Sequence, residues 1–523
     1  MKKILALILA LCMCIAVLVA CNDKDTAQTE TETKKETTTD TEAESKPVAD
    51  DDGDDDEDEG DEGDEGDGST PVEAEYTIGS VAEWEALAAA GDPDNEDFLN
   101  KTVKLTANID FGTATATTLF KTFAGTFDGG NFIVKGSSVS RFSLIANTLD
   151  GATVKNLTVD GFTIDPMIDG VKFASVIAAK AVTTATEAKN VTFENVAVLN
   201  CTIAADKVDG GNMGIGFVLG EAANVNVDAK NITVNACTVS GVDNQSRKIG
   251  GVVGFMTNSG LNTFEGIKVN MNVTARGHLG GVIGRSQGTG NLHIEKVKVT
   301  GTLDTAIACG GSEGVGGILG SIYNEAKAVG DSYVKNAYIN AKLFCSSGSG
   351  RAGGIAGNWY KNQNSEANLT VENCYVSGEF TVKQGNTMKD RAGGLFGEYG
   401  AHNSTLTLKN VILEAAIGQT WPGSATADPA VTPDVTKVGK SRDSVSDSWL
   451  INYASTTATV EGVSVATHTI TATNCYTTLV KRSNDAAVEL IAGFSNVTTD
   501  KTAAMISYDT NGYISAISAP AAS

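Results

Sequence analysis

The chain has few of the residues from which ordinary globular cores are built. Aromatic residues make up 6% of its 523 residues, and 8 prolines stand against 57 glycines. Several compact domains of usual composition would bury more aromatic side chains and place more proline in their loops. The composition therefore argues against a string of globular domains and favours a repeated, glycine-rich architecture.

Histidine, cysteine and positive charge are also scarce. The 4 histidines, at positions 278, 293, 402 and 468, lack the spacing of a zinc site. The net charge of −25 argues against nucleic acid as a partner. Of the 9 cysteines, those after Cys21 are too few for a disulfide framework in so long a chain. No cofactor, metal site or catalytic set is expected.

Long apolar runs are missing except at the N-terminus. There, Lys2 and Lys3 precede an apolar run from Ile4 to Val19, which is shorter than the roughly 20 residues that a spanning helix needs. Residues 1–21 are predicted to be a signal peptide. Its last residues, Leu18-Val19-Ala20-Cys21, look like a bacterial lipobox, so we expect lipid on Cys21 and a membrane anchor at the extracytoplasmic cell surface. An uncleaved anchor or an ordinary signal peptide is the alternative.

A strongly acidic segment follows the signal peptide. Residues 22–75 contain 24 Asp and Glu against 4 Lys, and Asp50 to Gly68 has no apolar residue. Such a segment cannot bury enough apolar surface to fold, and its charges repel one another. It is predicted to be a disordered linker between the anchor and the rest of the chain.

The main body carries a repeated Gly-Gly-x-x-Gly motif. Full copies end at Gly254, Gly284, Gly320, Gly357 and Gly397, and a weaker relative ends at Gly220. The intervals of 34, 30, 36, 37 and 40 residues suit a solenoid whose loops vary in length. A phosphate-binding loop is excluded by context, because each motif leads into polar residues and another β-type run instead of a helix.

That second run predicts how the chain stacks. Its copies include "ATVKNLTVDG" from Ala152, "LTVENCYVSG" from Leu369 and "LTLKNVILEA" from Leu406. Alternation with period 2 predicts two inward columns, which begin at Leu157 and Val159, and an outward column between them. The third copy is aligned as "ITVNACTVSG", which places Cys237 and Val239 in the inward columns.

An asparagine column precedes the first inward column. Asparagine tolerates the left-handed backbone region, and amides in adjacent repeats can bond one another. The predicted members of this structural column are Asn156, Asn195, Asn336, Asn373, Asn410 and Asn474. Strands that stack like residues on like, with Asn and Gly at the corners, predict an all-β fold, a right-handed parallel β-helix.

The same residues resemble a known family. The stretches "KTVKLTANIDF" at Lys101, "FAGTFDGGNFIVKG" at Phe123 and "DGATVKNLTV" at Asp150 are similar, together with the glycine motifs, to the GLUG-motif repeat proteins of bacterial cell surfaces. The resemblance covers about residues 76–476. It implies a right-handed β-helix in surface or adhesin-like proteins, generally without an assigned activity.

The domain boundaries follow from these patterns. "SVAEWEALAAAGD", with Ser80 as N-cap and Glu83 three residues on, predicts a capping helix. We expect an N-terminal cap and first coils over 76–150, β-helix repeats over 151–417, a long insertion over 418–467, and a final coil with a C-terminal cap over 468–523.

Several residues near the glycine motifs are candidates for ligand binding. The aromatic residues Tyr323, Trp359, Tyr360 and Tyr399 follow successive motifs, and Arg351 and Arg391 precede two of them. These rings either pack under neighbouring loops or offer a surface for sugar faces or a protein partner. The arginines belong to a basic column with Lys248 and His278 that can bind an acidic glycan or pair with neighbours such as Asp390 and Glu398.

Cys309 and Cys345 precede successive glycine pairs by 7 and 8 residues, which is compatible with a disulfide between adjacent coils or with two separate buried thiols. The expected function is a bacterial cell-surface lipoprotein that presents a β-helical rod for binding or adhesion, with a glycan or protein ligand and no catalysis. The alternative is a β-helical carbohydrate-active enzyme, a polysaccharide lyase or a glycoside hydrolase.

Overall fold

The structure is a computed structural model, and the residues it describes form an all-β arrangement of parallel sheets. The described ranges are 76–90, 98–165, 172–183, 185–205, 213–241, 246–257, 260–288, 290–305, 313–324, 331–345, 350–361, 368–382, 391–400, 404–418, 457–460, 463–466, 468–478 and 494–521. The predicted signal peptide with Cys21, the acidic linker and most of the predicted 418–467 insertion lie outside them.

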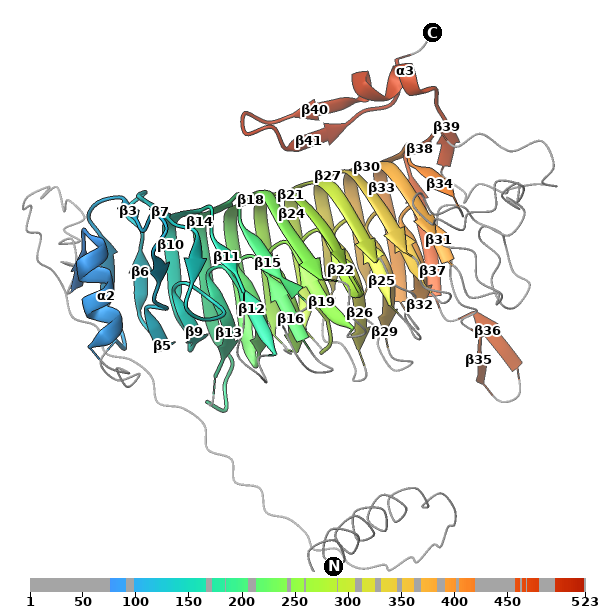
Figure 1. Cartoon of the computed structure of the whole chain (residues 1–523). Helices are drawn as coiled ribbons and strands as arrows, with labels where there is room; N and C mark the ends of the chain where they lie inside the picture. Colours follow the sequence, from blue (N-terminus) through green and yellow to red (C-terminus); the bar gives the residue numbers. More distant parts are fainter. Residues whose placement is uncertain are drawn as a thin grey trace, which may run out of the picture. The chain divides into compact units, whose positions relative to one another are not determined.

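Three parallel sheets make up most of the described chain (Figure 1). The largest, here the long sheet, has 21 strands. They are β1 (Tyr76–Ile78), β2 (Thr102–Leu105), β3 (Ile109–Asp110), β4 (Thr115–Ala116), β6 (Thr126–Asp128), β7 (Ile133–Lys135), β8 (Ser138–Val139), β10 (Thr153–Asp160), β11 (Thr163–Ile164), β14 (Lys189–Leu199), β15 (Thr202–Ala204), β18 (Val225–Gly241), β21 (Leu261–Ala275), β24 (Asn291–Thr305), β27 (Ser332–Cys345), β30 (Leu369–Val382), β33 (Ser404–Leu413), β34 (Ala416–Gly418), β37 (His468–Thr473), β38 (Cys475–Thr477) and β39 (Phe494–Asn496).

The other two sheets have shorter strands. The seven-stranded sheet contains β12 (Phe173–Ser175), β16 (Met213–Gly216), β19 (Arg247–Gly250), β22 (Gly277–Gly280), β25 (Gly314–Gly316), β28 (Arg351–Gly353) and β31 (Arg391–Gly393). The nine-stranded sheet contains β5 (Phe120–Phe123), β9 (Ala146–Leu149), β13 (Ala178–Val182), β17 (Leu219–Ala223), β20 (Val253–Thr257), β23 (Ile283–Ser286), β26 (Leu319–Asn324), β29 (Ala356–Lys361) and β32 (Phe396–Gly400).

From β10 to β32 the chain visits the sheets in a fixed order: long, seven-stranded, nine-stranded, and back to the long sheet. Each circuit is called a repeat here. Strands of successive repeats pair in parallel and in register, as Val297 with Ala337 and Val299 with Ile339 do. Because each circuit places equivalent residues beside one another, columns of like side chains run through the stack.

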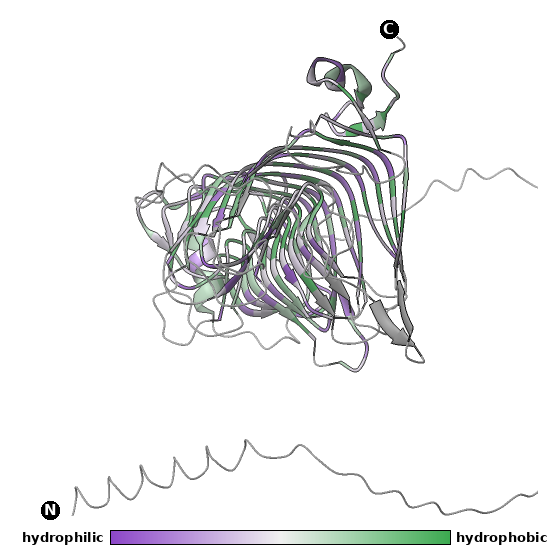
Figure 2. Ribbon diagram, turned by 90° about the vertical axis from the view of Figure 1, so that its right-hand side faces the viewer, coloured by the Kyte–Doolittle hydropathy of each residue, from purple (hydrophilic) through white to green (hydrophobic). Residues whose placement is uncertain are grey.

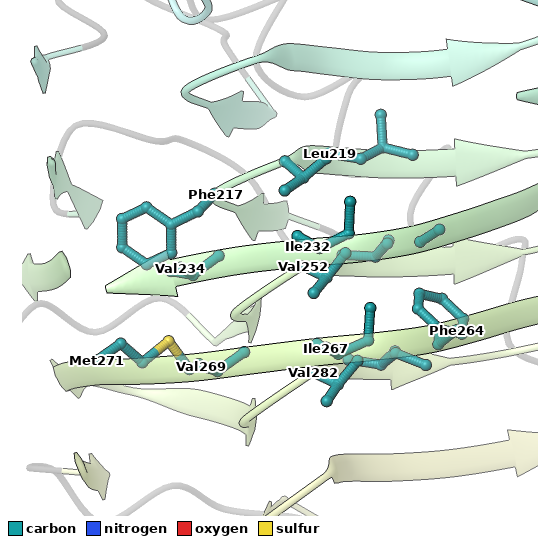
Figure 3. Close-up of a cluster of buried hydrophobic side chains, with 14 of the residues drawn as sticks. Phe217, Leu219, Ile232, Val234, Val252, Phe264, Ile267, Val269, Met271 and Val282 are labelled. Carbon is teal, nitrogen blue, oxygen red and sulfur yellow. The ribbon is translucent and has the colours of Figure 1, made fainter. Parts of the chain in front are cut away.

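The inward columns of the long sheet form the core. Seen at 90° to Figure 1, hydrophobic and hydrophilic positions alternate along the stacked strands (Figure 2). Every position of the two predicted inward columns outside the third repeat is almost fully buried, from Leu157 and Val159 to Cys475 and Thr477. In Figure 3, Ile232, Val234, Ile267 and Val269 of the long sheet lie near Val252 and Val282 at the bends between the other two sheets. The period-2 prediction is therefore confirmed.

The predicted register of the third repeat was wrong. Val196 pairs with Ile232 and Val198 with Val234, so these residues occupy the inward columns in place of Cys237 and Val239. The strand β18 contains two left-handed residues, Asn231 (φ 55°) and Ala236 (φ 54°). Both offer a bend followed by alternating apolar residues, and the sequence prediction chose the second one.

The glycine motif is explained by close packing of backbones. A Cβ at Gly250 would lie 2.1 Å from the carbonyl oxygen of Val253, and a Cβ at Gly254 would lie 2.2 Å from the backbone nitrogen of Ile215. Such separations are impossible for real side chains. The motif therefore lets the seven-stranded and nine-stranded sheets approach each other as the chain turns between them.

The ends of the described stack carry different elements. Helix α2 (Val81–Ala89) forms at the predicted position, with the Ser80 side chain accepting a hydrogen bond from the Glu83 backbone N–H at 3.2 Å. Its Trp84 is fully buried and lies edge-on to Phe111. Near the other end are α3 (Thr499–Thr502), the 3₁₀ helix η4 (Ala503–Met505) and two antiparallel hairpins, β35 (Thr457–Val460) with β36 (Val463–Ala466) and β40 (Ile506–Tyr508) with β41 (Ile514–Ile517).

Candidate functional site

The structure places Trp359 and Tyr399 in the core. Their exposed fractions are 1% and 0%, and their strands pair so that Ile322, Trp359 and Tyr399 follow one another in a buried column. The Trp359 ring lies edge-on to the Phe396 ring, with 6.3 Å between the ring centres. A buried ring cannot offer its face to a sugar, so the prediction of a ligand-binding surface is wrong for these two residues.

The other candidates of that surface fall into two groups. Tyr323 and Tyr360 pair in register on β26 and β29, and Arg391 pairs with Arg351 on β31 and β28. The side chains of Tyr323, Tyr360 and Arg391 lie outside the described part of the structure. Cys309 is outside it as well, whereas Cys345 is described and buried.

Arg351 forms an ion pair with Glu398, which confirms the interpretation that this part of the basic column pairs with neighbours. The Arg351 Nε donates to the Glu398 carboxylate, and the side chains are 14% and 6% exposed. Breaking one partner of such a pair would leave a buried charge, which is strongly destabilising. Arg351 is thus held in place by its own chain.

The pair belongs to a larger, mostly polar and mostly buried layer, the polar seam, between the seven-stranded and nine-stranded sheets. Its residues are Lys248, His278, Gly314 and Arg351 on one sheet and Glu221, Phe255, Arg285, Ser321, Asn358 and Glu398 on the other. The two columns face each other, since the Lys248 ammonium lies 5.5 Å from the centre of the Phe255 ring and His278 contacts Ser321.

Burial changes the protonation equilibria of the seam. Desolvation, helped by the charge of Arg285, lowers the pKa of Lys248 to about 8. Desolvation also raises the pKa of Glu221 and of Glu313, which lies beside the seam. Groups with perturbed pKa values cluster at active sites, but buried ion-pair networks perturb them as well.

The contact most like a catalytic pair is that of Ser321 and His278. The Ser321 Oγ lies 2.8 Å from the His278 Nδ1, and a histidine in this position can activate a hydroxyl as a nucleophile. Desolvation and the charges of Arg285, Lys248 and Arg351 hold the pKa of His278 well below its usual range. The imidazole is therefore a poor base, and both side chains are buried. We interpret the contact as a structural hydrogen bond.

The asparagine column is confirmed. All six predicted members have φ of 53° or 54°, in the left-handed region. Amide hydrogen bonds link Asn195 to Asn156 at 3.0 Å, Asn373 to Asn336 at 3.1 Å and Asn410 to Asn373 at 2.9 Å. Asn231, which the sequence alignment missed, also belongs to this column and bonds Asn195 at 3.0 Å. The column is structural.

Two repeats have a residue other than asparagine in the asparagine column. A neighbouring column of charged residues explains the difference. On the outer face of the long sheet, charges alternate through most repeats, but Glu265 pairs in register with Glu295. At this step the asparagine column contains Gly266 (φ 71°) and Lys296 (φ 55°). The Lys296 ammonium lies 2.6 Å from Glu265, and the Asn336 amide donates to Glu295. The lysine separates two like charges that would otherwise repel.

The outer face of the long sheet presents regular columns of side chains. One column consists mostly of threonine: Thr102, Thr126, Thr153, Thr192, Asp228, Thr263, His293, Tyr333, Thr370, Thr407 and Thr471. Another, here the outer column, consists of Thr158, Ala197, Thr233, Lys268, Lys298, Tyr338, Tyr375, Ile412 and Tyr476.

Part of this face is covered by the chain itself. The hairpin β40–β41 and η4 contribute Met505, Ile514 and Ile517 to an apolar cluster with Ile412 and Tyr476. Tyr338 and Tyr375, stacked at 5.2 Å, pack against the same cluster. The Lys268 ammonium lies 5.0 Å from the centre of the Tyr513 ring, so the hairpin extends along the outer column from Tyr476 to Lys268.

The C-terminal segment therefore does two things. Strands β37, β38 and β39 continue the long sheet, as expected for a final coil. The following residues fold back along the outer face, where Thr502 donates a hydrogen bond to Glu414 at 2.9 Å. The outward column was expected to meet water or a partner, and in these repeats the partner is the chain's own hairpin.

A hollow lies beside helix α2. It has a volume of about 260 Å³ and is lined by Ala88, Thr117, Thr118, Leu119, Phe120, Lys121, Arg141 and Asn147. Ligand pockets usually enclose roughly 300 to 1,000 Å³ and bury most of their ligand. This hollow is smaller and open, so we do not assign it a ligand.

Among the residues described, no three His, Cys, Asp or Glu side chains gather in a way that would hold a metal ion. Within those same ranges, none of the helices is long and apolar enough to cross a bilayer.

Comparison with known proteins gives no relative. No family model, no curated protein and no solved structure matches the chain.

Proposed function

We propose that the protein is a bacterial cell-surface lipoprotein whose right-handed parallel β-helix presents the outer face of the long sheet for binding or adhesion. The observation that carries the proposal is the regular, polar outer face of the repeats that the C-terminal hairpin leaves open. The resemblance to GLUG-motif surface proteins supports it through "DGATVKNLTV" and the glycine motifs. Anchoring through lipid on Cys21 would place this face outside the cell membrane.

The open face has the chemistry of a polar binding surface. Thr153 and Thr192 are half-buried and in register on neighbouring strands, and Thr233, also half-buried, pairs with Ala197 in the outer column. Charged side chains beside them are balanced by ion pairs within the sheet, such as the one between the Lys155 ammonium and the Asp128 carboxylate at 3.8 Å. A surface with ordered hydroxyl groups and balanced charge suits a neutral glycan or a polar protein surface better than a polyanion.

The acidic segment fits the same arrangement. If residues 22–75 form the predicted linker, their 24 acidic residues against 4 lysines would repel one another and would favour an extended chain. Such a spacer would hold the β-sheet region away from the membrane and make its outer face accessible. The membrane is therefore one partner, through Cys21, and a surface glycan or protein is the other.

Anchoring can be tested first. Cys21→Ala should release the full chain from the membrane fraction into the medium, because the acyl chains on Cys21 are the proposed anchor. An unchanged membrane fraction would contradict the lipoprotein assignment without bearing on the binding face.

Binding is tested with the released Cys21→Ala chain on a glycan array and on immobilised extracellular-matrix proteins. A double variant, Thr192→Arg with Thr233→Arg, blocks the open face, and Glu187→Arg, in an exposed turn before β14, is the matched control. Loss of the signal only in the double variant supports the proposal. Equal signals from all three proteins would place the site elsewhere.

The same samples test the alternative of a β-helical carbohydrate-active enzyme. A lyase or a hydrolase needs convergent acid and base groups around a glycan bond. Products released from acidic and neutral polysaccharides would be detected by mass spectrometry. Turnover would favour the enzyme over the binding protein.

A further inference from the structure

Cys201 and Cys237 lie next to each other in the core. Thr202 and Thr238 are in-register partners on β15 and β18, and the Thr238 N–H donates to the Cys201 carbonyl oxygen at 2.9 Å. Each cysteine follows a left-handed residue, Asn200 in one repeat and Ala236 in the next. The two cysteines therefore occupy equivalent positions on adjacent strands.

Both side chains point to the interior and meet there. Cys201 is 1% exposed and Cys237 is 0% exposed. Neighbouring strands lie about 4.8 Å apart, within the Cα separation of about 4.4 to 6.8 Å that disulfides span. The two thiols also interact directly. Contact with Cys237 and burial raise the pKa of Cys201 well above its usual range, whereas contact with Cys201 lowers the pKa of Cys237, so Cys237 is the more acidic thiol of the pair. A lower pKa favours the thiolate, the form that attacks a disulfide.

The other thiols described by the structure provide a contrast. Cys374 and Cys475 belong to the same inward column, but Val411 lies between them. They are two strands apart, about 9.6 Å, which no disulfide spans. Burial raises the pKa of Cys374 to about 12. These thiols behave as small apolar core residues.

We propose that Cys201 and Cys237 are a disulfide site that links two successive repeats when the chain folds in the presence of a low-molecular-weight disulfide. One thiolate attacks the oxidant R–S–S–R, forms a mixed disulfide and releases one R–SH. The second thiolate then attacks the protein sulfur of the mixed disulfide and releases the second R–SH. Two electrons and two protons pass from the protein thiols to the oxidant.

Burial determines when this exchange occurs. In the folded chain neither sulfur is accessible, so the oxidant reaches them before β15 and β18 are covered or during local opening. Once formed, the link is protected from reduction by the same burial. The site is independent of the proposed binding function, and its test does not depend on a ligand.

The test is peptide mapping of the full chain. The protein is unfolded and reduced, refolded with oxidised and reduced glutathione, denatured, alkylated with N-ethylmaleimide and digested with trypsin without reductant. Trypsin places Cys201 in peptide 190–207 and Cys237 in peptide 231–247. We expect these two peptides to be joined and to lose most of their alkylation, while the peptide with Cys374 stays alkylated.

Variants and a second sample make the result decisive. Cys374→Ser should leave the joined peptides unchanged, and Cys201→Ser should abolish them and leave Cys237 alkylated. The same mapping on wild-type chain folded during expression in an oxidising periplasm avoids the refolding step. Full alkylation of both cysteines in folded wild type, or glutathione on either without the link, would overturn the proposal.

Discussion

The repeats before β21 and those from β21 onward share one interior but have different exteriors. Their inward columns contain the same kinds of buried aliphatic residues, such as Val198 in the first group and Val376 in the second. The outer column is small in the first group, with Thr158, Ala197 and Thr233. In the second group it contains lysine, tyrosine and isoleucine, the positions along which the C-terminal hairpin lies.

The difference shows that the size and polarity of the outward side chains depend on whether the hairpin covers them. A large apolar side chain on an open sheet face gains little and invites aggregation, whereas the same side chain beneath a hairpin buries its surface. Ile412, for example, is fully buried although it belongs to an outward column. The small outer residues of the earlier repeats mark the face left for another partner or for water.

The largest expected effect tests the shared interior. Val376→Asp places a charge in the core without a partner and should lower the free energy of unfolding by about 3 to 5 kcal/mol. Val198→Asp should cost a similar amount, because the inward columns are equivalent in both groups. Thermal and denaturant melts measure both. A mild effect of either would mean that the two interiors differ.

The next effect tests the covered exterior. Tyr375 stacks on Tyr338, and its hydroxyl donates to Glu414 at 2.6 Å. Tyr375→Ala should lower the free energy of unfolding by about 2 to 3 kcal/mol, since aromatic contacts and a partly buried hydrogen bond are lost. Thr233→Ala, the equivalent change on the open face, should stay within about 0.5 kcal/mol. Equal values in denaturant melts would show that the hairpin does not stabilise the covered face.

A smaller effect comes from raising the pH. Desolvation raises the pKa of Tyr513 to about 12. Between about pH 10 and 12 the unfolded chain loses this proton and the folded chain keeps it, so stability falls by at most about 2 kcal/mol as pH rises. Tyr513→Phe should reduce the fall in the free energy of unfolding over this pH range, as measured by denaturant melts at each pH. If the variant loses stability with pH as steeply as the wild type, ionisation of Tyr513 is not the cause of the loss.

The smallest effect concerns the position between the two groups. Lys296→Asn restores the asparagine column but removes a half-exposed ion pair with Glu265, so stability should change by less than about 0.5 kcal/mol. Lys296→Val should cost about 1 to 2 kcal/mol, because a β-branched residue tolerates φ of 55° poorly. If both variants melt alike, the left-handed conformation is not what this position requires.

The fold was largely predictable because repetition averages out local ambiguity. Positive φ at Asn156 or Asn373 follows from asparagine recurring before the same apolar pair. Register failed only where one strand offered two such bends, at Asn231 and Ala236. A single repeat contains no information that distinguishes them, whereas pairing with Asn195 does.

The candidate site was less predictable because it depends on which residues of each strand point inward and on contacts between distant parts of the chain. Phe396 and Tyr399, three residues apart, both pack into the core, while Glu398 between them lies in the polar seam. The period-2 alternation of inward and outward side chains is therefore interrupted at Gly397. The sequence alone cannot show whether Tyr399 points into the core or out of it. The hairpin position depends on contacts between residues far apart in the sequence, such as Lys268 and Tyr513, although the change in the outer column was a usable signal.

In a stack whose repeats touch only their neighbours, unfolding can begin at an end and proceed one repeat at a time. The contact of Tyr513 with Lys268 connects the last described segment to a strand several repeats earlier. The end of the stack then cannot fray until the hairpin has lifted. The fold-back thus converts what would be a sequential, zipper-like transition into a more nearly all-or-none one over β21 to β38, at the cost of a higher contact order and slower folding.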